Sequence, residues 1–134
     1  MTMSMTLSTA QTIVSRAIDQ AQRDFKRPIC VHVCDANGFE LAFARMDGAP
    51  IRSIEISRRK AFTAVRIGVP TQAFLERLRK DNLEASWFGD DLCALPGGVP
   101  IKDGSGAIVG GVGISGLAAS EDQVIAEAVA ALVR

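Results

Sequence analysis

The sequence is poor in aromatic and histidine side chains and has no excess charge of either sign. Its 134 residues include no tyrosine, one tryptophan and one histidine, and 15 basic residues balance 15 acidic ones. A surface without net charge sets up no long-range field that would attract phosphate backbones or anionic lipid. No apolar run is long enough to cross a bilayer. Neither nucleic acid nor a membrane is therefore expected as a partner.

The shortage of histidine also limits the chemistry. One imidazole cannot supply both a catalytic triad and a metal site, and no serine lies in the G-x-S-x-G setting of a hydrolase nucleophile. Hydrolase activity is therefore not expected.

Cysteine content and the first residues bear on location. The three cysteines, Cys30, Cys34 and Cys93, cannot all pair, and the first two lie too close on one expected strand for an easy disulfide. The segment 1–8 has neither the positive start nor the apolar core of a secretion signal. Reduced thiols and this start predict a cytoplasmic protein.

Length and apolar periodicity predict one α+β domain over residues 1–134, because a chain of this size can bury a real core. Ser8 and Gln11 form a capping-box pattern for a first helix that ends before Pro28. The remaining expected elements are a hairpin of strands 29–35 and 39–46, a helix 51–67, a short helix 71–80 capped by Thr71, a loop 81–94, a hairpin of strands 99–101 and 107–114, and a helix that starts near Ser120. The last helix is expected to bury Val124, Ile125, Ala128, Val129 and Leu132.

The string Gly111-Val112-Gly113-Ile114-Ser115-Gly116 matches the G-x-G-x-x-G pattern of dinucleotide sites. Such a site needs a following parallel strand and an acidic residue about 20 positions further on, but the sequence stops in the next helix. These glycines instead indicate close packing against a helix, a cofactor or a subunit.

Cys30, His32 and Cys34 alternate along the first strand, so their side chains share one face. A structural zinc site would need a fourth ligand, and the only other cysteine or histidine in the sequence is Cys93, in an expected loop. Buried packing roles are the favoured interpretation, and His32 remains a minority candidate for a haem ligand because it is the one imidazole.

Lys60 lies on a helical stripe of small and apolar residues. If the stripe is buried, the ammonium needs a carboxylate partner or must lose its proton. Asp47 is the nearest acid upstream of the helix. Lys60 is then either half of a structural ion pair or an anchor for a ligand carboxylate such as a haem propionate.

Arg45 and Asp47 close a strand and open a loop, which is a common place for binding groups. Arg45 can hold a carboxylate through two hydrogen bonds, or can simply cover apolar surface with its stem. Gly97 and Gly98 allow a close backbone approach or a tight turn.

Three segments, 45–49, 59–64 and 96–101 running on to 113–116, keep an order and spacing that resemble the GlcG/HbpS-like family (DUF336). That family is also related to the C-terminal domain of corrinoid adenosyltransferases. The resemblance covers residues 8–133 and implies a profilin-like fold with a five-stranded antiparallel sheet flanked by helices. Four strands follow from the pattern, and the fifth would come from 92–94 or from a split in the glycine-rich strand.

The resemblance also implies a homo-oligomer and a haem cofactor. In one relative, an exported sensor partner, the threonine that matches Thr63 has been linked to the haem iron, which makes Thr63 a candidate ligand here. Because no secretion signal is evident, the chain is more similar to the relatives associated with glycolate, glycerol or diol catabolism.

Three hypotheses follow. The first is a cytoplasmic, homo-oligomeric accessory protein that binds haem or another carboxylated small molecule. The residues assigned to that ligand are Arg45, Asp47, Lys60, Thr63, Gly97 and Gly98. The second is a small enzyme that uses Lys60 and Asp47 as acid and base, and the third is a non-catalytic structural companion of a larger enzyme.

Overall fold

The computed structural model describes residues 5–133. Residues 1–4, part of the segment searched for a secretion signal, and residue 134 therefore lie outside the described residues. The helices are α1 (Leu7–Gln20), continued by a π-helical turn (Ala21–Phe25), α2 (Arg52–Ile67), α3 (Thr71–Asp81), a short 3-10 turn (Ala85–Phe88) and α4 (Ala119–Ala130). The strands are β1 (Cys30–Asp35), β2 (Glu40–Arg45), β3 (Gly98–Lys102) and β4 (Ile108–Ser115).

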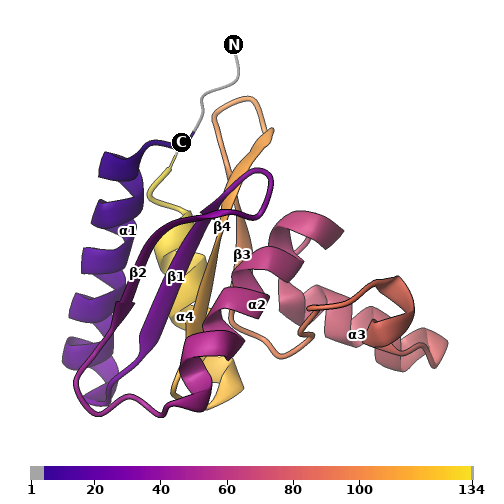
Figure 1. Cartoon of the computed structure of the whole chain (residues 1–134), viewed down its shortest axis with the longest axis horizontal. Helices are drawn as coiled ribbons and strands as arrows, with labels where there is room; N and C mark the ends of the chain where they lie inside the picture. The colour runs from indigo at the N-terminus through magenta and orange to yellow at the C-terminus, as the bar shows by residue number, and fades with distance from the viewer. Residues whose placement is uncertain (1–4, 134) are drawn as a thin grey trace.

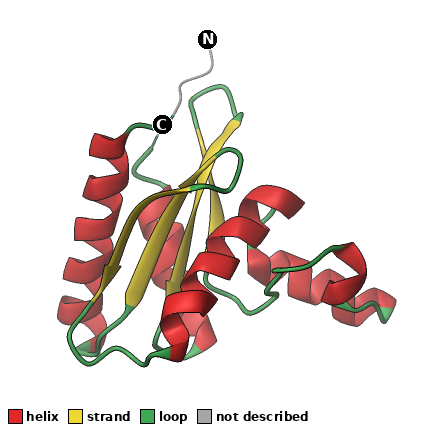
Figure 2. Ribbon diagram, viewed as in Figure 1, coloured by secondary structure: helices red, strands yellow, loops and turns green. Residues whose placement is uncertain are grey.

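The strands form one antiparallel sheet in the order β2-β1-β4-β3. Both predicted hairpins are present, and β1 joins them by pairing with β4. Helices α1 and α4 pack together on one face of the sheet, α2 crosses the other face, and α3 lies beyond α2 (Figure 1). Figure 2 shows the same layers, with the sheet between helices on both sides. The α+β class is confirmed.

The expectation of a fifth strand is wrong for the part of the chain from 5 to 133, where the sheet has four strands. The glycine-rich strand does not split, because β4 is paired along its length with β1 on one side and β3 on the other. Segment 92–94 is a loop that lies against α2, where the Cys93 N–H donates to Thr63 Oγ1 at 2.8 Å.

The apolar core lies between the sheet and the α1–α4 pair. From the sheet it takes Val31, Val33, Ile101, Val112 and Ile114, and from the helices Ala10, Ile13, Ala17, Ile125, Ala126 and Val129. These side chains alternate along the strands and recur at helical spacing, as one buried face of each element requires.

On the opposite face of the sheet, β3 and β4 carry Gly98, Gly111 and Gly113 where α2 crosses them, and α2 packs directly on the backbone there. A Cβ at Gly113 would overlap the Ser57 carbonyl oxygen, one at Gly98 would overlap the Lys60 carbonyl, and one at Gly111 would come within 2.7 Å of the Ala61 carbonyl oxygen. The prediction that these glycines make room for close packing is confirmed, and the element that uses the room is α2.

Three helix starts differ from the sequence expectation. Thr6, not Ser8, caps α1, where its side chain accepts from the Thr9 N–H. Thr71 does not cap α3, since its hydroxyl accepts from the Gly98 N–H at 2.9 Å and so ties the helix to β3. Helix α4 does start near Ser120, but its first residue is Ala119 and its N-cap is Ala118, so Ser120 lies inside the helix and does not cap it.

The buried face of α4 is also rotated relative to the prediction. Ile125 and Val129 are buried as expected, but Val124 and Leu132 are 52% and 47% exposed, and Ala128 is exposed with them. Asp122 and Gln123 point inward in their place, because both have buried partners at the end of the sheet.

The close approach of α2 predicts a steric penalty at Gly113. We expect Gly113→Ala to lower the free energy of unfolding by about 3 kcal/mol, because α2 must move off the sheet. Gly106→Ala is the control: its site is open and carries only a left-handed φ of +88°, so its loss should be about 1 kcal/mol. Urea denaturation measures both, and equal losses would contradict the packing argument.

Candidate functional site

Lys60 is the largest fully buried side chain in the described residues, at 1% exposure. It starts on the middle of α2, on one face of the sheet, and its ammonium reaches Asp122 in the first turn of α4, on the other face. Nζ lies 3.1 Å from Asp122 Oδ2 and donates to the Ile114 carbonyl oxygen at 2.7 Å. This ion pair joins the two helical layers past the end of the sheet.

The backbone at Gly97 makes room for this crossing. A Cβ at Gly97 would lie 2.7 Å from Lys60 Nζ and 2.6 Å from the Ile114 carbonyl oxygen, and its φ of +128° is one that favours glycine. Its N–H donates to Gln123 Oε1 at 2.7 Å, and its carbonyl accepts from the Ile114 N–H. The missing side chain at Gly97 therefore leaves space for the Lys60 ammonium, whereas the missing side chain at Gly98 lets α2 approach the sheet.

Burial and pairing act against each other on both charged groups. Burial raises the pKa of Asp122 to about 6, against the attraction of the Lys60 ammonium. Burial likewise lowers the pKa of Lys60, and Asp122 opposes that shift. Asp122 also accepts a hydrogen bond from the Leu117 N–H at 3.1 Å.

A small cavity of about 150 Å³ opens beside the ion pair. Its wall combines α2, the end of β4, the start of α4 and the loop before β3. The lining residues are Arg52, Ser53, Ile56, Lys60, Leu95, Ser115, Gly116, Leu117, Ala119 and Asp122. The middle of α2 and the end of the glycine-rich strand thus meet around one hollow.

Asp47 is not the partner of Lys60, and that prediction is wrong. Asp47 is exposed on the loop after β2 and lines a separate, shallow groove of about 250 Å³ with Met46 and Pro28. Asp47 was predicted because it is the acid closest to the helix in the sequence. The actual partner, Asp122, is 62 positions away from Lys60 and lies on α4. The spacing did hold a signal: Asp122 precedes Ile125, Ala126 and Val129 by three, four and seven positions, on one buried face.

The other predicted site residues lie around this region without lining the cavity. Arg45 is exposed at the end of β2, opposite Cys30 in register, and Cys30 is opposite Ser115 of the cavity. Thr63 is buried one turn along α2 from Lys60, and its hydroxyl is used by the Cys93 N–H.

His32 is enclosed between β2 and α2, with 2% of its surface exposed. Its Nδ1 lies 3.2 Å from Glu40 Oε1, and its ring lies 6.0 Å from that of Phe43. Burial first, and then the Arg58 charge, lower its pKa to about 4. The described residues hold no group of three or more side chains suited to a metal ion. Cys30, His32 and Cys34 are all buried in the structure.

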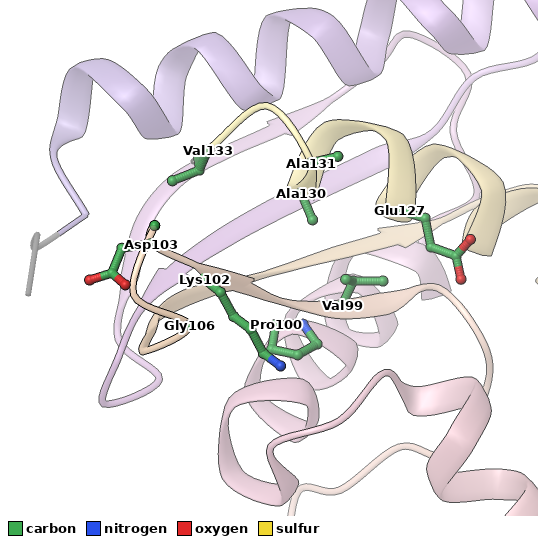
Figure 3. Close-up of a pocket in the computed structure, with 10 residues that line it drawn as sticks. Val99, Pro100, Lys102, Asp103, Gly106, Glu127, Ala130, Ala131 and Val133 are labelled. Atoms are coloured by element: carbon green, nitrogen blue, oxygen red, sulfur yellow. The ribbon is translucent and has the colours of Figure 1, made fainter.

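A larger hollow lies elsewhere and is an open groove of about 430 Å³ between β3, its turn to β4 and the end of α4 (Figure 3). Val99, Pro100 and Ala130 provide apolar lining, with Lys102 and Glu127 as charged groups. None of the predicted site residues lines it.

This geometry defines a small α+β domain with a buried lysine–aspartate pair at one end of its sheet. The chain belongs to the HbpS-like family, whose model, described as "Haem degrading protein HbpS-like", matches residues 5–131. The resemblance drawn from the three sequence segments is therefore confirmed.

Solved structures agree with this assignment. A double mutant of HbpS from Streptomyces reticuli is 32% identical, with a TM-score of 0.89 over 100% of this chain and 90% of that one. A haem complex of PduOC is 26% identical, with a TM-score of 0.87 over 98% of this chain and 96% of that one. A Klebsiella pneumoniae DUF336 protein, ORFY, shares the fold at 22% identity and a TM-score of 0.83, over 98% of this chain and 92% of that one.

Two curated relatives match the chain at similar identity. An uncharacterised 15.0 kDa protein from the dhaT-dhaS intergenic region of Citrobacter freundii is 29% identical over 92% of this chain and 87% of its own length. The corrinoid adenosyltransferase PduO of Salmonella typhimurium is 30% identical over 87% of this chain. The match covers 35% of that enzyme, so this chain spans about a third of its length. No helix of residues 5–133 is long and apolar enough to span a membrane.

The ion pair predicts a strongly non-additive mutant cycle. Asp122→Asn leaves a buried, unpaired ammonium, so we expect a loss of about 3 kcal/mol or more in unfolding free energy, and a comparable loss for Lys60→Met. The double variant Lys60→Met/Asp122→Leu should recover most of it, because no buried charge remains. Additive losses in urea denaturation would show that the two groups do not act as a pair.

The burial of His32 predicts an acid-sensitive contribution to stability. The folded-state pKa of about 4 lies below the ordinary value, so the unfolded chain binds more protons between the two. Stability therefore rises with pH from about 4 to about 6.5, by on the order of 3 kcal/mol. Asp122, whose pKa is raised, acts in the opposite sense below about pH 6. The unfolding free energy of wild type and of His32→Gln, measured from about pH 4 to about pH 6.5, gives the contribution of the histidine by difference. Two curves that run parallel over this range would contradict the prediction.

Proposed function

We propose that this chain is a haem-binding accessory protein that works as a homo-oligomer in the cytoplasm. The observation that carries the proposal is the family match together with the likeness to PduOC, a protein solved as a haem complex, over 98% of this chain. An association with a glycolate, glycerol or diol pathway is part of the same proposal, and so is the treatment of the chain as one domain.

The residues present fit the carboxylate end of a haem. Lys60 and Arg52 both line one cavity, and two cationic side chains suit a propionate. Arg45 and Ser115 lie on the two strands that flank Cys30. Adjacent strands are about 4.8 Å apart, which puts these two positions about 10 Å from one another. Arg45 is therefore placed to meet a second carboxylate.

The residues of a single chain are less well suited to ligate the haem iron or to enclose the porphyrin. His32 would have to leave its position between β2 and α2, and the Thr63 hydroxyl already accepts a hydrogen bond. Four hollows of the described residues measure about 150 to 430 Å³, and the larger ones are open. A surface or intersubunit position is therefore the one that we propose for the porphyrin plane.

Exposed apolar side chains support self-association. Val124 and Ala128 on α4 and Leu132 just beyond its end are exposed, and Trp87 is 64% exposed beyond α3. Apolar surface of this kind is commonly covered by another copy of the chain.

An acid–base enzyme is the second candidate. Its favourable observation is the Lys60–Asp122 pair, in which burial shifts both pKa values toward neutrality beside a cavity. In this version Asp122 takes the place first given to Asp47. The structural companion remains the third candidate, and it needs no ligand at all.

Hemin titration tests the haem proposal. We expect a saturable shift of the Soret band at a fixed number of hemin molecules per oligomer, with light scattering on the same samples to give the oligomer size. Arg45→Gln should weaken binding roughly fivefold, because it removes one charge-assisted hydrogen bond, while Arg59→Gln, exposed and away from the cavity, should not. Featureless, non-saturating uptake of hemin would overturn the proposal.

A further inference from the structure

Two helices begin at the wall of the Lys60 cavity. Arg52 and Ser53 are the first residues of α2, Ala119 is the first residue of α4, and all three line the cavity. Figure 1 shows these two helix starts at the same end of the molecule. Among residues 5–133, no side chain caps the N-terminus of α2. Helix N-termini present unpaired N–H groups and the positive end of the helix dipole, and both favour an anion.

Buried hydroxyl groups point to a ligand independently of the helix ends. Ser53 and Ser115 are 1% and 5% exposed and line the cavity, yet within residues 5–133 neither hydroxyl has a hydrogen-bond partner. No fully enclosed side-chain oxygen or nitrogen of the described chain is unsatisfied, so these two oxygens open onto the cavity. The Lys60 ammonium adds a third donor, because it has three N–H bonds and uses two.

The charge of the wall suits a single negative charge. Arg52 and Lys60 contribute two positive charges and Asp122 one negative charge, which leaves one positive charge in excess. Glu121, next to Asp122 in the sequence, bonds to Arg27 and to the Ala118 N–H and does not line the cavity. A monoanion would make the site neutral, whereas a dianion would leave an unpaired negative charge in a small, partly apolar space.

The size of the cavity limits the ligand. About 150 Å³ corresponds to roughly five water molecules, since each takes about 30 Å³ in the liquid. Ile56, Leu95 and Leu117 give the rest of the wall an apolar character, which suits methyl or methylene groups. We infer that the Lys60 cavity is a recognition site for a carboxylate with a chain of about two or three carbons. The carboxylate is held by Ser53, Ser115, Arg52 and the third N–H of Lys60.

Such a carboxylate has two sources. It is either a free short-chain acid or the propionate arm of a larger ligand, including the haem proposed above. The inference rests on the cavity and not on haem binding, so the two proposals can fail separately.

The first experiment follows backbone amide shifts by ¹⁵N NMR while sodium acetate or sodium propionate is added to the wild-type protein at constant ionic strength. Saturable shifts at Ser53, Ser115 and Ala119 are expected. Acetamide, which has the shape of acetate without its charge, should give none. Shifts that grow linearly without saturation, or that are equal for acetamide, would overturn the inference.

Variants then locate the site without disturbing the ion pair. Arg52→Gln/Ser53→Ala keeps Lys60 and Asp122 and should raise the Kd for propionate at least about tenfold, which corresponds to about 1.4 kcal/mol. Arg59→Gln lies on the same helix but does not line the cavity, so its Kd should stay within about twofold of wild type. If the double variant loses the native spectrum, Arg52→Gln alone, at an exposed position, takes its place. Equal Kd values in wild type and both variants would contradict the assignment.

A competition experiment separates the two sources. If the site takes a haem propionate, free propionate should compete with hemin, and hemin dimethyl ester should bind more weakly than hemin. If the site takes a free acid, propionate should bind without changing the hemin titration. Both results support a carboxylate site, and saturable propionate binding without any hemin binding would sink the haem proposal alone. Absence of propionate binding together with equal binding of hemin and its dimethyl ester would overturn this inference alone.

Discussion

The structure depends on one charge that crosses from one side of the sheet to the other. Lys60 belongs to α2, Asp122 belongs to α4, and the sheet lies between these helices. The crossing is possible because Gly97 has no side chain at the point where the ammonium passes. Breaking a buried pair of this kind is costly even where its net contribution is small, so the pair fixes the position of α4 against α2. The same contact places both helix starts and two free hydroxyls around one cavity.

The glycine face of the sheet sets the distance at which this contact can form. Helix α2 lies so close to β3 and β4 that its backbone oxygens occupy the places where Cβ atoms would be. At this separation the Lys60 side chain reaches the Ile114 carbonyl oxygen and Asp122. Gly98, Gly111 and Gly113 therefore determine both how closely α2 packs on the sheet and where the Lys60 ammonium lies. A larger residue at one of these positions would be expected to move the ammonium as well.

Much of the fold could be predicted from local pattern, and much of the site could not. The hairpins and α2 follow from turn residues and periodicity, and the family follows from three segments. The rotation of α4 was missed because the pattern counted only apolar residues as buried, whereas Asp122 and Gln123 face inward. Likewise Thr71 looks like a cap in the sequence, but its partner is a backbone amide 27 positions away. Such contacts join residues that are far apart in the sequence, and the spacing of residues within one helix or strand does not predict them.

The edge of the sheet carries a consequence for how copies of the chain can meet. β3 is an outer strand, and Pro100 stands in its middle. A proline there has no N–H to offer to an incoming strand, which is a known way to stop sheets from growing edge to edge. Contacts between copies of the chain would then have to use another surface, such as the exposed Val124 and Ala128 on α4, rather than extension of the sheet along this edge.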